Sequence, residues 1–162
     1  MTAPAFPLLP DVVAHAVSYG LADNPDGGLM MLQPYVEDGP STTYQVLVCL
    51  AEAALIRTRQ EHRPTCEFGM RIETLDGDER STDDLSPGSR FAAQFVTAWA
   101  NLDEDTTSAL FMGLAARGDR EGGTEIGEAV RTLFGFAVAT AAEIRADIQA
   151  EVRECRTDDD RM

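Results

Sequence analysis

The feature that most constrains the fold is a run of apolar residues between Thr124 and Arg156 that recurs at steps of three and four. This spacing is that of one face of a helix and predicts one long helix. Residues 132–142, in the middle of the run, include no charged side chain. A helix that is apolar on every side must be covered on every side, by its own fold or by a second copy of the chain.

Beyond residue 143 the pattern narrows to an apolar seam between charged residues. A helix over 124–156 is roughly 50 Å long at 1.5 Å per residue, which exceeds the diameter of a domain of this size. We therefore expect its end to project and to be buried against a symmetry mate. The alternative is a bend near Gly135 that folds the end back onto the strands. The predicted homodimer interface consists of Ile144, Ile148, Val152 and Cys155, flanked by Asp147 and Glu151.

Two strands are predicted in the first half of the chain. Residues 66–73 alternate between apolar and polar side chains, which is the pattern of a half-buried strand. Residues 29–36 form an apolar run in which Pro34 favours an edge strand. Apolar spacing and capping residues predict helices near residues 12–19, 43–62, 86–102 and 103–118. The predicted class is α+β and predominantly helical: about five helices, a sheet of two or three strands and a long central C-terminal helix.

The length of 162 residues favours a single domain, which we place at residues 1–156. Three consecutive aspartates near the C-terminus predict a disordered acidic tail over 157–162. The first ten residues contain three prolines and no basic residue, so we expect no signal peptide. No uncharged segment reaches the roughly 18 residues needed to cross a bilayer. The expected protein is soluble and cytoplasmic.

The charged residues exclude several chemistries. The formal net charge is −15, and all 13 basic residues are arginines. Without lysine there is no Schiff base, no phosphate-loop lysine and no biotinyl or lipoyl attachment. The acidity has three explanations: codon bias in a GC-rich genome, salt adaptation, or mimicry of nucleic acid. A negative surface argues against direct binding to nucleic acid or to anionic membranes.

Candidate metal and catalytic groups do not form a recognisable motif. Cys49, Cys66 and Cys155 are widely spaced, which indicates reduced, packed thiols rather than a disulfide framework or a zinc site. His15 and His62 stand outside ligand or triad spacings. The loop at residues 76–78 lacks the oxygen ligands of a calcium loop at its later positions. We therefore predict no metal, no cofactor and no catalytic residue.

These observations favour a small, acidic, non-catalytic interaction or regulatory protein from a GC-rich bacterium, its phage or a mobile element. Its expected partners are a second copy of the chain and another protein. One alternative is an acidic nucleic-acid mimic that inhibits a DNA- or RNA-binding protein. Another is a small enzyme whose site is assembled from scattered residues.

Overall fold

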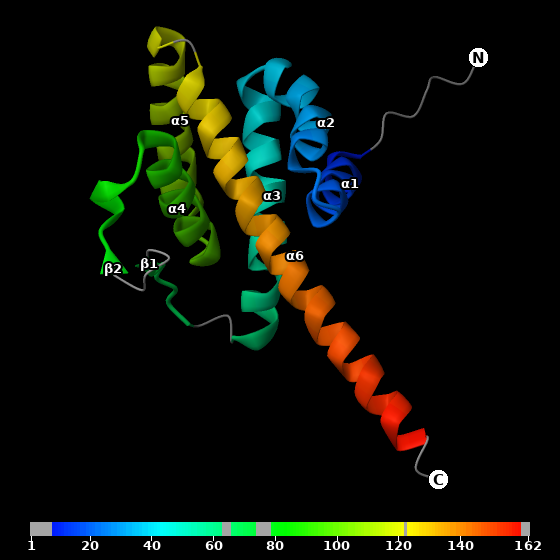
Figure 1. Ribbon diagram of the computed structural model, residues 1–162. Coiled ribbons are helices and arrows are strands. Elements are labelled where there is room, and N and C mark those ends of the chain that lie inside the picture. Colours follow the sequence, from blue (N-terminus) through cyan, green and yellow to red (C-terminus); the bar gives the residue numbers. More distant parts are fainter. Residues whose placement is uncertain (1–7, 63–65, 74–78, 122, 160–162) are drawn as a thin grey trace, which may run out of the picture.

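Six α-helices make up nearly all of the chain that the structure describes, which comprises residues 8–62, 66–73, 79–121 and 123–159 of a computed structural model (Figure 1). Pro stands in the first turn of α1, α2, α3 and α4, where its missing N–H costs no helical hydrogen bond. The helices are α1 (Leu9–Leu21), α2 (Pro25–Glu37), α3 (Pro40–Glu61), α4 (Pro87–Ala100), α5 (Glu104–Glu121) and α6 (Thr124–Asp159).

The predicted α+β class is wrong, because the described residues are almost entirely helical and do not form the predicted sheet. Extended pairing in the described residues is limited to β1 (Ile72–Glu73) and β2 (Glu79–Arg80), two residues each. A ladder this short has no face that could cover a core. Residues 66–71, the rest of the predicted alternating strand, have no regular secondary structure.

The apolar run at residues 29–36 is helical and belongs to α2. The Asn24 side chain accepts a hydrogen bond from the backbone N–H of Gly27 and caps this helix, which begins at Pro25. Leu32 is fully buried, so burial against neighbouring helices outweighs the cost of Pro34 inside the helix.

Helices α1, α3, α4 and α5 pack against α6, and α2 packs against α1 and α3 (Figure 1). The first half of α6 contributes Ala129, Val130, Leu133, Phe134 and Ala137 to one apolar cluster shared with α1 to α5. The largest fully buried side chains of that cluster are Phe95, Leu32, Leu47, Leu50, Leu114 and Leu133.

The second half of α6 extends away from the other helices (Figure 1). With 36 residues the helix is about 54 Å long. It continues as one helix through Gly135, so the alternative of a bend there is not what the structure shows. The helix reaches Asp159, three residues into the segment expected to be a tail, and residues 160–162 lie outside the described part of the chain.

Candidate interaction site

The exposed end of α6 contains all six residues predicted to form an interface. Ile148 and Val152 are 55% and 54% exposed, and Cys155 is exposed as well. Ile144, one turn earlier, is partly buried. Asp147 and Glu151 are exposed on the same helix. The seam is therefore an apolar face that this chain alone leaves in water, and the interface stays a prediction.

Where the exposed end of α6 begins, two arginines connect this helix to its neighbours α3 and α1. Nη1 of Arg57 in α3 lies 3.1 Å from Oδ2 of Asp147 and 3.4 Å from Oε2 of Glu143. A hydrogen bond to Glu61 and the charge of Asp147 raise the pKa of Arg57 above its usual value. Arg145 donates to the carbonyl of Leu21 at the end of α1, at 3.2 Å. The helix is thus anchored on α1 and α3 as far as Asp147.

Sequence reasoning did not predict this anchor. The basic residues at the end of the helix predicted near residues 43–62 fit the ordinary role of offsetting the negative end of the helix dipole. Arg57 is 86 residues from Glu143 in the chain, so only the tertiary fold brings them together.

A pocket of about 590 Å³ opens where α1, α3 and α6 meet. Small side chains from all three helices leave this space: Ala14, Ala53, Ala137 and Ala141. The remaining apolar lining includes Val13, Val17, Leu21, Ile56 and Ile144. Ile144 therefore belongs both to this pocket and to the exposed seam of α6.

Cys49 also lines this pocket. Burial, followed by the nearby charge of Glu52, raises the pKa of its thiol. A thiol with a raised pKa is a poor nucleophile at neutral pH. Cys49 is therefore a partly buried wall residue of this pocket whose thiol is not activated as a thiolate.

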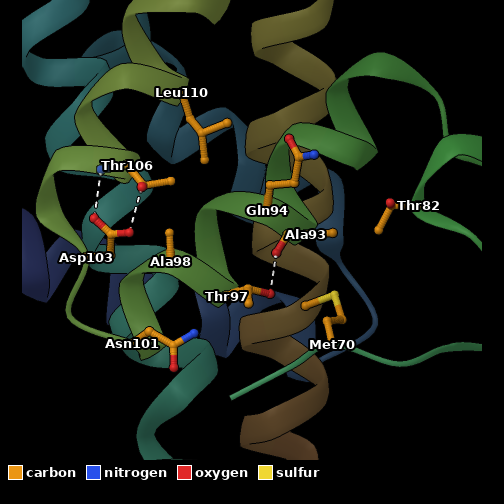
Figure 2. A pocket seen from close by; sticks show the side chains of 10 residues that line it. All are labelled: Met70, Thr82, Ala93, Gln94, Thr97, Ala98, Asn101, Asp103, Thr106 and Leu110. Atoms are coloured by element: carbon orange, nitrogen blue, oxygen red, sulfur yellow. Dashed lines mark hydrogen bonds between the residues drawn. The ribbon is translucent and has the colours of Figure 1, made fainter. Parts of the chain in front are cut away.

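A second pocket of about 510 Å³ lies between α4 and α5, beside Met70 and Thr82 (Figure 2). Asp103 accepts hydrogen bonds from the backbone N–H and the hydroxyl of Thr106, at 3.0 and 2.6 Å, which lowers the pKa of Asp103. Asn101 exchanges two hydrogen bonds with the backbone of Phe68, at 2.7 and 2.9 Å. Asp103 and Asn101 thus cap α5 and pin the extended segment, so these polar groups serve the fold.

Each of the two histidines contacts a backbone carbonyl four residues earlier in the chain. Nδ1 of His15 lies 3.1 Å from the carbonyl oxygen of Asp11, and Nδ1 of His62 lies 3.0 Å from that of Thr58. The three cysteines are free thiols. Across the described ranges, no cluster of three or more His, Cys, Asp or Glu side chains has the geometry of a metal site. The loop at residues 76–78 lies outside those ranges.

The fold and the seam define an all-helical protein with an apolar helix end exposed beyond its core. No known protein family matches the sequence, and neither curated proteins nor solved structures contain a match. In the part of the chain that the structure describes, no helix combines the length and apolar character needed to cross a membrane.

Proposed function

We propose that this chain is a non-catalytic interaction protein that works as a homodimer through the end of α6. The observation that supports the proposal is the seam itself: two β-branched side chains, more than half exposed, on a helix that extends beyond the core. An apolar stripe between charged residues is typical of a helix that packs against another helix.

The free energy gained by burying the seam shows how much more apolar surface the interface must bury. Completing the burial of a half-exposed Ile or Val contributes roughly 1 kcal/mol, so Ile148 and Val152 from two copies contribute about 4 kcal/mol. That corresponds to a dissociation constant near 1 mM before the cost of association. A micromolar dimer needs about twice as much, so it must also bury Ile144 and apolar surface next to it.

A cytoplasmic location is part of this proposal. The three free cysteines support it, because a reducing compartment keeps such thiols unpaired. An acidic mimic of nucleic acid is less well supported, because Arg57 neutralises part of the negative charge of Glu143 and Asp147.

Mass in solution tests the homodimer. Light scattering at micromolar concentration should give twice 17.6 kDa for the unmodified chain and 17.6 kDa for Ile148→Glu. Ala146→Glu adds the same charge at an exposed position on the opposite face of α6 and should keep the doubled mass. A mass of 17.6 kDa for the unmodified chain would show that the proposal is wrong.

A further inference from the structure

The pocket between α1, α3 and α6 and the seam of α6 form one continuous apolar surface. Ala137, Ala141 and Ile144 line the pocket, and Ile148, Val152 and Cys155 follow on the same helical face at steps of four, four and three. The chain thus has an apolar pocket and, directly next to it, the exposed apolar seam of α6.

A two-fold axis would bring these two features together. If two α6 helices pair antiparallel with Ile144 of one opposite Ile148 of the other, Val152 lies opposite Thr140 and Cys155 lies opposite Ala137. Val152 and Cys155 then lie level with Ala137 and Ala141, two of the small side chains that leave the pocket open. Such reciprocity is what an isologous interface requires, because the same patch must match itself.

The surface area that a dimer interface must bury also indicates that the pocket is part of the interface. A specific interface buries roughly 800 Å² on each partner, more than four side chains on one helix can supply. The pocket walls add apolar surface from α1 and α3 immediately next to the seam, including Ile56, which is 48% exposed.

We propose that the pocket between α1, α3 and α6 receives the α6 seam of a second copy, with the two α6 helices antiparallel. This inference rests on the proposed function, since it specifies how the homodimer is built. It predicts that residues of α1, which is not part of the seam, control dimerisation.

Ala14→Arg is the variant that tests the pocket. Ala14 is exposed on α1 and lines the pocket, so an arginine there should leave the fold intact and weaken dimerisation at least tenfold. His15→Arg introduces the same side chain at the adjacent exposed position, which is not part of the pocket lining, and should dimerise like the unmodified chain. Circular dichroism of each variant checks the fold, and sedimentation gives the dissociation constant.

The outcomes separate this inference from the function on which it rests. If Ala14→Arg dimerises normally while Ile148→Glu is monomeric, the homodimer stands and the pocket is not its docking site. If the unmodified chain is monomeric, both proposals fail.

Thiol cross-linking gives an independent readout of orientation. In a chain with Cys49→Ser and Cys66→Ser, Ser18→Cys places a thiol on the exposed α1 wall of the pocket, and Cys155 remains. A short bis-maleimide adds to both thiols without an oxidant and should join position 18 of one copy to Cys155 of the other. A link between the two Cys155 residues would indicate parallel helices and overturn the inference.

Discussion

At the scale of single residues, two glycines differ in how closely a neighbouring helix approaches them. The backbone N–H of Gly88, at the start of α4, donates to Glu128 of α6 at 3.2 Å, and the hydroxyls of Ser86 and Ser89 donate to the same carboxylate. A Cβ at position 88 would lie 2.6 Å from Cβ of Glu128. A Cβ at Gly135, by contrast, would meet nothing within 4 Å.

Alanine at these two glycines should therefore have opposite effects. We expect Gly88→Ala to lower the free energy of unfolding by about 1–3 kcal/mol, because the two helices must separate. Gly135→Ala should raise it by about 0.5–1 kcal/mol, because alanine is the better helix former in an exposed helix interior. Urea unfolding measures both changes. Equal effects at the two positions would contradict the close packing of α4 against α6.

At the scale of elements, α6 is one helix with two roles. Up to Ala141 its apolar face packs against the core, and from Ile148 the same face lies in water. Arg57 and Arg145 mark the boundary, because they bind α6 to α3 and α1 through Asp147 and the carbonyl of Leu21.

Removal of the second half should therefore abolish dimerisation without unfolding the chain. A chain that ends after Asp147 should be monomeric, and its free energy of unfolding should lie within about 0.5 kcal/mol of that of Ile148→Glu, which keeps the full length. A chain that ends after Arg156 should keep the doubled mass. Loss of cooperative unfolding in the shorter chain would show that the end of α6 belongs to the core.

At the scale of the whole molecule, charge opposes association. Each chain carries −15, so a homodimer carries −30, twice that value. Like net charges repel over distances set by ionic strength, whereas burial of an apolar seam does not depend on charge.

Dimerisation should consequently become tighter as salt increases. Between 50 and 500 mM NaCl we expect the dissociation constant, measured by sedimentation, to fall several-fold because screening removes the repulsion. Ile148→Glu should remain monomeric at both concentrations. A dimer that weakens steeply with salt would instead indicate an interface held by ion pairs.

The sequence alone was sufficient to predict features that depend on local spacing. The three- and four-residue recurrence after Thr124 identified the long helix, and its length indicated that Ile148 and Val152 would project. Both deductions follow from the rise and period of a single helix, so they require no knowledge of neighbouring elements.

Only the tertiary structure decided what depends on partners distant in the chain. Alternation in residues 66–73 predicts a strand, but a sheet also needs neighbours, and the backbone of Phe68 instead bonds to the side chain of Asn101. The apolar run at residues 29–36 predicts an edge strand, but it is helical in the structure, where Leu32 is fully buried against other helices. The pocket combines side chains from α1, α3 and α6, and the ion pairs of Arg57 with Glu143 and Asp147 join α3 to α6. No periodicity within one segment encodes such contacts, because they arise only when separate helices pack.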